Sequence, residues 1–344
     1  MIEINKDNEQ ILAKNHYVPK GYLRNWCHSD NKLWVYRSLV SNADVPLWKR
    51  ATPSAIAYHF HLYTKLGDKN LDDEVEKWFD RDFESPAQGA INCVLDNLKL
   101  SPEDWNNLVR FVALQDARTP SRLRDHMERA PRKLSEVLSE LAEEIPHKLS
   151  DLKPKDRKGI KNNNLLPLRF TPIKEHDGTF INIESYVGRS TWLFSLRYIL
   201  TDTIRVLHKH KWTIIRPYKG MKWFTSDNPV IRLNFTNHDK YDLNGGWDVK
   251  QGNILLPLSP EHLLLTQMGC RPPIKGFRFD KDLTVFIRKI IAENAYRMIF
   301  SSEPDSEIIK LSPRKVDAKL FKQEKDMWNE WHDKNLLMEK EFKQ

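Results

Sequence analysis

The hydrophobic pattern of this chain changes its period near residue 211, and that change limits the folds it can adopt. Before this point apolar residues recur at three- and four-residue steps, as they do on one face of a helix. After it, short apolar runs are separated by turn residues, which predicts strands joined by turns. These runs are Trp212–Ile215, Trp223–Thr225, Val230–Leu233, Ile254–Leu256 and Leu263–Thr266. Helices followed by antiparallel strands are typical of the α+β class.

We therefore predict an α+β fold, with a mainly helical N-terminal half and a C-terminal antiparallel sheet flanked by helices. A small sheet is expected in the first half, where Leu33–Tyr36 and Tyr58–Tyr63 have strand patterns and are expected to pair. The halves are residues 1–150 and 183–344. Residues 151–182 are polar and basic, so we expect a linker or insertion there. Motif residues occur in both halves, which favours one composite domain.

Helical periodicity marks several further segments. Ser101–Pro102–Glu103–Asp104 combines a serine cap, a proline at the first helical position and a carboxylate three residues after the cap, which predicts a helix from there to Arg118. Thr119 and Pro120 are expected to end that helix and begin another. Other predicted helices are Pro19–Cys27, Leu71–Leu98 with a kink at Pro86, Leu134–Leu149, Ile183–Lys211, Leu283–Arg297 and a terminal helix after Ser312.

The charge balance points to an anionic partner. Among the 344 residues, 55 Lys and Arg exceed 47 Asp and Glu, for a formal net charge of +8. Residues 147–174 and 205–222 each carry a formal charge of +6, from 8 basic and 2 acidic residues in the first and 6 basic and no acidic residues in the second. RNA or DNA is the commonest partner of such a chain.

Other classes of protein are disfavoured. With 40% hydrophobic residues the chain is too apolar to be disordered. It has no apolar run of roughly 18 residues and no signal peptide at its start, so we expect no membrane span and a cytoplasmic location. Three widely separated cysteines argue against a disulfide framework or a thiolate zinc site. Phosphate-loop, dinucleotide, zinc-helix and nucleophile-elbow motifs are all absent from the sequence.

Three polar residues extend an apolar helical stripe that begins at Leu108 and Phe111. Gln115, Arg118 and Arg122 follow at steps of three or four residues, and buried groups of this kind need partners. In one interpretation Arg118 binds a phosphate or carboxylate with two hydrogen bonds while Gln115 orients the substrate. In the other, Arg118 is largely buried and paired with Glu84. The sequence leaves both open.

Other candidate residues stand at turns and helix starts. His16 precedes a proline-initiated helix, where a neutral imidazole serves either as a base or as a buried donor. Asp227 and Asn228 follow an apolar strand, and such residues either make a turn or provide an acid, a base or a metal ligand. A row of carboxylates with helical spacing, typical of a solvated face, comprises Asp73, Glu76, Asp80 and Glu84.

Several separated segments together resemble an uncharacterised bacterial family known as domain of unknown function 4238, over about residues 15–302. They are NHYVPKGYLRNW, ATPSAIAYHFHLYT, the acidic helix with Glu76 and Glu84, FVALQDARTPSRLRDH, FTSDNPV, LPLSP and ENAYRMIFSS. The family supplies no activity. The resemblance implies that its motif positions here are His16, Tyr17, Pro19, Arg118, Thr119, Pro120, Asp227, Asn228, Pro229 and Asn294. Residues 131–182 match no family motif.

These features favour an enzyme acting on nucleic acid or nucleotides, most concretely a phosphodiester-cleaving nuclease such as an RNase-like toxin or defence effector. The expected catalytic residues are His16, Glu84, Arg118 and Asp227. The expected substrate-binding residues are Gln115, Arg122, Asn228 and Asn294. The sequence specifies no cofactor, and a divalent metal near Asp227 and Asn228 stays an open alternative. The rival hypothesis is a non-catalytic module that binds nucleic acid or protein and whose motif residues form a structural polar network.

Overall fold

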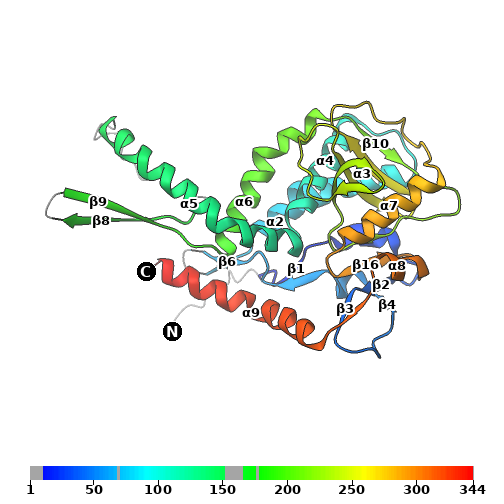
Figure 1. The fold of residues 1–344 in the computed structure, drawn as a ribbon, viewed down its shortest axis with the longest axis horizontal. Helices are drawn as coiled ribbons and strands as arrows, with labels where there is room; N and C mark the ends of the chain where they lie inside the picture. Colours follow the sequence, from blue (N-terminus) through cyan, green and yellow to red (C-terminus); the bar gives the residue numbers. More distant parts are fainter. Residues whose placement is uncertain (1–10, 68–69, 152–165, 176–177, 344) are drawn as a thin grey trace, which may run out of the picture.

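A four-stranded antiparallel sheet joins the two halves of the chain (Figure 1). The computed structural model describes residues 11–67, 70–151, 166–175 and 178–343. In this sheet β2 and β4 come from the first half, and β11 and β16 come from the second. Met298 of β16 lies opposite Arg37 of β2. The strand order is β11 (Thr225–Ser226), β16 (Met298–Ser301), β2 (Leu33–Arg37) and β4 (Trp48–Ala51).

A five-stranded antiparallel sheet forms the centre of the second half and confirms the predicted α+β class. Its central strands are buried almost throughout, which explains why their sequences are continuous apolar runs. Helix α7 (Lys281–Asn294) packs its apolar face into the core shared with this sheet. The strand order is β10 (Trp212–Ile215), β15 (His262–Gln267), β14 (Asn253–Ser259), β12 (Ile231–Asn237) and β13 (Lys240–Asp242).

The first half is helical, as predicted. Before Pro86 the helix widens into a π turn at Asp80–Glu84, so the regular α-helical hydrogen bonding is interrupted just ahead of the proline. At Ser101 the predicted capping box is confirmed, because Ser101 Oγ accepts from the Asp104 N–H at 3.1 Å and Asp104 accepts from the Ser101 N–H at 2.7 Å. The elements are α1 (Lys20–Leu23), the 3₁₀ turn η1 (Arg24–Trp26), α2 (Glu74–Phe79), the π turn η3 (Asp80–Glu84), α3 (Ser85–Leu95) and α4 (Pro102–Ala117).

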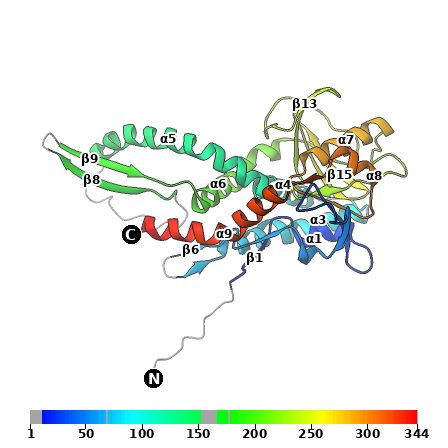
Figure 2. The same cartoon turned by 60° about the horizontal axis from the view of Figure 1, so that its bottom comes forward.

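Helix α5 (Pro120–Asp151) and a hairpin of β8 (Arg169–Glu175) and β9 (Gly178–Glu184) project from the body as an arm (Figures 1 and 2). Helix α5 includes the segment Leu134–Leu149 that was predicted as helical. The range 151–182, expected as a linker or insertion, thus contains β8 and most of β9. Residues 152–165 lie outside the described residues.

The predicted helix Ile183–Lys211 is wrong at both ends. Ile183 and Glu184 complete strand β9, because residues 181–184 alternate in polarity and pair with β8. Helix α6 (Arg189–Thr201) begins only after Gly188, and a 3₁₀ helix, η5 (Thr203–Lys209), replaces its expected continuation.

The expected pairing of the strands at Leu33–Tyr36 and Tyr58–Tyr63 is also wrong. Strand β5 (Tyr58–Phe60) is shorter than predicted and pairs with β1 (Lys14–His16), whereas β2 pairs with β4 and β16. His61 has a positive φ of 52°, which takes the chain out of the extended conformation and ends β5. Strand partners in this region are therefore set by long-range contacts.

The C-terminal helix α9 (Ala318–Lys343) confirms the predicted terminal helix and lies along the body (Figure 1). Two buried side chains hold it there, since Arg189 donates to Glu339 at 3.0 Å from Nε and at 2.8 Å from Nη2. No helix in the described ranges has both the length and the apolar character to cross a bilayer. The remaining elements are η2 (Pro53–Ala55), α8 (Ser306–Leu311) and the pairs β3 (Leu39–Val40) with β17 (Lys315–Val316) and β6 (Lys65–Leu66) with β7 (Leu71–Asp72).

Candidate functional site

Arg118 lies at the centre of a buried polar cluster between α4 and the π turn. Its side chain is 0% exposed, and Nη1 lies 2.7 Å from Oε1 of Glu84. When the Gln115 amide is oriented to satisfy both groups, its oxygen accepts from Nη2 and Nε of Arg118 at 2.9 Å each. The phenol of Tyr63 donates to the backbone oxygen of Arg118 at 3.0 Å. The prediction of a buried Arg118 paired with Glu84 is thus confirmed.

Glu76 joins this cluster, although its sequence pattern was typical of a solvated face. Burial raises the pKa of Glu76 to about 8, with the charge of Glu84 adding to the shift and Arg118 opposing it. Sequence reasoning missed this role because a single row contains both inward and outward carboxylates, and Asp80 of the same row is exposed. The π turn between α2 and α3 changes which side of the helix faces the core.

His16 is 8% exposed and stands at the end of β1. Burial, together with nearby Lys20 and Lys14, lowers its pKa to about 4, so the imidazole is neutral at pH 7. Its Nε2 has no hydrogen-bond partner among the described residues. His16 does not line the cavity described below, and neither do Glu84, Arg118 and Gln115.

A second buried cluster joins the end of α4 to the end of α7. Thr119 Oγ1 donates to Oδ1 of Asn228 at 3.0 Å, and Asn228 Nδ2 donates to the backbone oxygen of Asn294 at 3.0 Å. Asn294 Nδ2 donates in return to the backbone oxygens of Asn228 at 2.6 Å and Val230 at 3.0 Å. Both asparagines are buried, and these bonds use their amide groups to hold the backbone.

Asp227 is 1% exposed and accepts hydrogen bonds from three consecutive backbone N–H groups. Tyr296 donates to Oδ1 at 2.8 Å, while Arg297 and Met298 donate to Oδ2 at 2.8 and 3.0 Å. Burial raises the pKa of Asp227 to about 7, although these backbone bonds oppose the shift. The carboxyl group therefore positions the segment that leads into β16, and it also lines a cavity.

Arg122 belongs to a third cluster. The stripe that contains Gln115 and Arg118 does not continue to Arg122, because α4 ends at Ala117 and Arg122 lies in the first turn of α5. Nε and Nη2 of Arg122 donate to Oδ1 of Asp116 at 3.0 and 2.8 Å. The structure thus separates Arg122 from the other two residues.

Five family motifs meet at one cavity of about 660 Å³. Tyr17 comes from the segment NHYVPKGYLRNW, Pro120 from FVALQDARTPSRLRDH and Asp227 from FTSDNPV. Residues 55–61 come from ATPSAIAYHFHLYT, and residues 296–298 come from ENAYRMIFSS. Helix α9 provides another wall. The remaining lining residues are Arg37, Leu39, Ala55, Ile56, Ala57, Tyr58, His59, Phe60, His61, Tyr296, Arg297, Met298, Phe321, Glu324, Lys325, Trp328, Asn329, His332 and Asp333.

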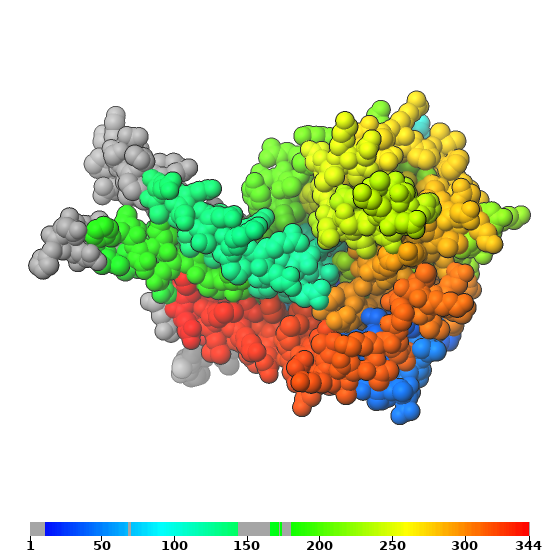
Figure 3. Space-filling view, viewed as in Figure 1, coloured from blue at the N-terminus to red at the C-terminus, as the bar shows by residue number. Residues whose placement is uncertain are grey.

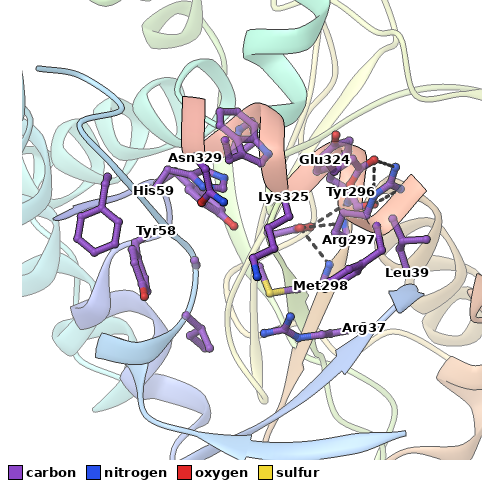
Figure 4. A pocket seen from close by; sticks show the side chains of 18 of the residues that line it. Arg37, Leu39, Tyr58, His59, Tyr296, Arg297, Met298, Glu324, Lys325 and Asn329 are labelled. Carbon is purple, nitrogen blue, oxygen red and sulfur yellow. Dashed lines mark hydrogen bonds and ion pairs between the residues drawn. The ribbon is translucent and has the colours of Figure 1, made fainter. Parts of the chain in front are cut away.

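Two cationic side chains in this cavity have no carboxylate partner among the described residues. Arg37 comes from β2 and Lys325 from α9, and both are exposed. Figure 4 shows them reaching into the same part of the cavity, with Tyr58 and His59 across from them. A third cation, Arg297, donates from Nε to both oxygens of Glu324 at 3.1 and 2.8 Å, so its charge is already paired.

Aromatic rings from β5, α9 and the residue after β1 also line the cavity. His59 stacks on Trp328 with ring centroids 3.9 Å apart and an interplanar angle of 14°, and on Tyr17 at 5.3 Å and 27°. Burial lowers the pKa of His59 to about 3, so this ring is neutral. Burial and the nearby Asp227 raise the pKa of Tyr17 well above its ordinary value, so its phenol stays protonated and able to donate.

Sequence reasoning missed Arg37, Lys325 and Trp328 as cavity residues. Arg37 closes a strand, and the other two lie in a charged terminal helix, so no local motif marks them. Within the described residues, no cluster of three or more His, Cys, Asp or Glu side chains is arranged to hold a metal ion. The open alternative of a divalent metal at Asp227 and Asn228 therefore gains no support from this geometry.

Of three comparisons with known proteins, the one with family models gives a match, and that match covers the motifs that meet at the cavity. Neither the curated proteins nor the solved structures contain a match to this chain. One family model, described as "Protein of unknown function (DUF4238)", matches residues 14–305. That range includes every motif that reaches the cavity and ends before α9. Because the match covers most of the chain, this protein belongs to the DUF4238 family.

Proposed function

We propose that the cavity binds a nucleotide, either free or as a unit of single-stranded RNA or DNA. The observation that carries this proposal is that Arg37 and Lys325, which have no carboxylate partner in the described part of the chain, face aromatic rings of β5 across one cavity. Phosphate oxygens pair with such cations, and bases stack on flat rings. A volume of about 660 Å³ suits a small ligand, since pockets for such ligands span roughly 300–1,000 Å³.

The hydrogen bonds of the motif residues favour binding over catalysis as their main role. Arg118 and Glu84 pair with each other, and the Asn228 and Asn294 amides hold backbone groups. Most of the expected catalytic and substrate-binding residues thus build the frame of the cavity. In this proposal the ligand is recognised by residues carried on that frame, namely Arg37, Lys325, Tyr17 and Trp328.

Phosphodiester cleavage, the reaction of an RNase-like toxin or defence effector, is the second candidate. One observation favours it, because Asp227 lines the cavity and has a pKa of about 7. A carboxyl group with that pKa exchanges protons near neutral pH, as a general acid or base must. Tyr17 would donate to a phosphate oxygen in the same cavity.

Binding is tested with fluorescently labelled single-stranded RNA and DNA, by anisotropy, and with mononucleotides, by calorimetry. We expect saturable binding at low salt that weakens steeply as salt rises, because phosphate contacts release counterions. The double variant Arg37→Gln/Lys325→Gln should weaken binding by at least about tenfold. Lys322→Gln removes an exposed charge from α9 outside the cavity and is the matched control. Absence of binding by the wild-type protein at low salt would refute the proposal.

Cleavage is tested separately by incubating RNA and DNA with the protein, with and without divalent metal, and separating the products on gels. The second candidate predicts shortened products from the wild-type protein and none from a folded Asp227→Asn variant. Binding without cleavage would eliminate the nuclease and leave the binding proposal intact. Circular dichroism establishes whether the variant is folded.

A further inference from the structure

A second large cavity lies on the other side of the α4–α5 junction, between α5 and α6. Its volume is about 710 Å³. The two helices touch near the body and then diverge, and Figure 3 shows the notch that separates them. None of the residues that line this notch lines the nucleotide cavity, so the two are distinct.

The wall of the notch is mainly apolar. Helix α5 contributes Leu134 and Val137, and Val137 is 40% exposed. Helix α6 contributes Leu196, Ile199 and the exposed Tyr198. Aliphatic side chains of α5 and α6 face each other along the two helices. The wall therefore suits a ligand with an extended hydrocarbon chain.

The rim at the inner end of the notch has an excess of positive charge. Four cations line it, Arg122, Arg129, Lys133 and Arg232, against the two carboxylates of Asp116 and Asp125. Arg129 is 61% exposed and only loosely paired, at 3.7 Å from Asp125. Lys133 has no carboxylate partner among the described residues.

Asp116 does not neutralise this excess. Its oxygens already accept two hydrogen bonds from Arg122 and one, at 2.7 Å, from the indole N–H of Trp247. Arg232 reaches the same carboxylate only at 3.5 Å, and its Nε has no hydrogen-bond partner in the described part of the chain. A half-buried guanidinium with so few partners among the described residues favours an additional anion nearby.

We propose that this notch is a second binding site, for a carboxylic acid with a medium-length acyl chain. The chain lies between the aliphatic faces of α5 and α6, and the carboxylate pairs with Lys133, Arg129 and the guanidinium of Arg232. Charge complementarity selects an acid over a cation of the same length. The apolar wall selects a long chain over a short one.

Calorimetry on the full chain tests this site with decanoate below its micelle concentration. We expect one saturable site for decanoate, and no binding of acetate, which lacks the chain, or of decyltrimethylammonium, which has the opposite charge. Val137→Glu places a carboxylate on the exposed wall and should weaken decanoate binding by at least about tenfold through repulsion and lost apolar contact.

Two adjacent lysine and arginine positions give a matched pair for the rim. Lys133→Ser should weaken decanoate binding about threefold or more, whereas Arg132→Ser should not, because Arg132 is 79% exposed, pairs with Glu136 and does not line the notch. Absence of saturable decanoate binding up to about 1 mM would overturn the proposal. So would equal binding of decyltrimethylammonium, or equal effects of the two single variants. None of these outcomes bears on nucleotide binding.

Discussion

The guanidinium of Arg118 and the carboxylate of Glu84 meet at 2.7 Å across the contact between α4 and the π turn η3. The arginine is completely buried, whereas the Glu84 side chain is 21% exposed. The helix that carries Arg118 and the turn that carries Glu84 are thereby held together by a charge pair as well as by apolar packing. Neither residue lines the cavity of about 660 Å³, so the pair supports its frame from outside the lining.

Arg118→Ala should lower the free energy of unfolding by about 3–5 kcal/mol, because it leaves Glu84 and Gln115 without their partner. Chemical denaturation followed by circular dichroism measures this change. Arg132→Ala is the control, since Arg132 is exposed on α5 and paired only with a helix neighbour. An unchanged midpoint for Arg118→Ala would contradict the structural role of the pair.

Glu76 makes stability depend on pH. Its pKa is about 8 in the folded protein against an ordinary value of 4.5, so the folded state binds more protons than the unfolded state between these values. The contribution of this carboxyl group to the free energy of unfolding is therefore fully present below pH 4.5, and it is lost as the pH rises towards 8. Glu76→Gln keeps the side chain neutral and should become more stable than the wild-type protein across that range.

Denaturation at several pH values measures the difference between Glu76→Gln and the wild-type protein. The difference cancels the contributions of the buried histidines, which both proteins share. Glu74→Gln, an exposed change on the same helix, should show no such pH-dependent gain. A constant difference for Glu76→Gln from pH 5 to pH 8 would rule out a buried, protonated Glu76.

Asn294→Ala should cost about 2 kcal/mol of unfolding free energy, because it removes the donor to two buried backbone oxygens. A double-mutant cycle with Asn228→Ala should give a clear coupling energy, since each asparagine holds the backbone of the other. Asn253→Ala, whose amide makes only one exposed bond, is the control. Additive effects of the two changes would show that the asparagines act independently.

Trp328→Ala should weaken binding of single-stranded oligonucleotides by about 1–3 kcal/mol, the usual contribution of one base stacked on one aromatic ring. Anisotropy titrations measure the effect. Met327→Ala alters the neighbouring residue of α9, which is 44% exposed and does not line the cavity, and should bind as the wild-type protein does. Equal affinities for all three proteins would remove Trp328 from the ligand-binding surface.

Local signals in the sequence predicted much of the fold. The capping box at Ser101 and the apolar runs of the five-stranded sheet depend on neighbouring residues, and both are confirmed. The partner of β5 depends on residues far away along the chain, and the prediction failed there. The hairpin of β8 and β9 had a local signal in the alternation of residues 181–184, which the basic character of the region obscured.

The candidate site was predicted only in part, for a physical reason. Helical spacing can show that Arg118 needs a partner, and the pairing with Glu84 followed from that requirement. It cannot show whether an asparagine or aspartate binds a ligand or the backbone, and Asn228, Asn294 and Asp227 all bind backbone groups. Arg37 and Lys325, which lack carboxylate partners within the described ranges, come together only when β2 and α9 meet at the cavity.

Helix α9 lies outside the segment that defines the family, yet it supplies one wall of the cavity in which the family motifs meet. The shared segment and the terminal helix therefore contribute to the cavity in different ways. The shared segment supplies a frame of interlocked backbone and amide groups. The helix contributes Lys325 and Trp328 to the cavity wall, so under the proposed function substitutions along α9 should change which ligands bind while the frame stays the same.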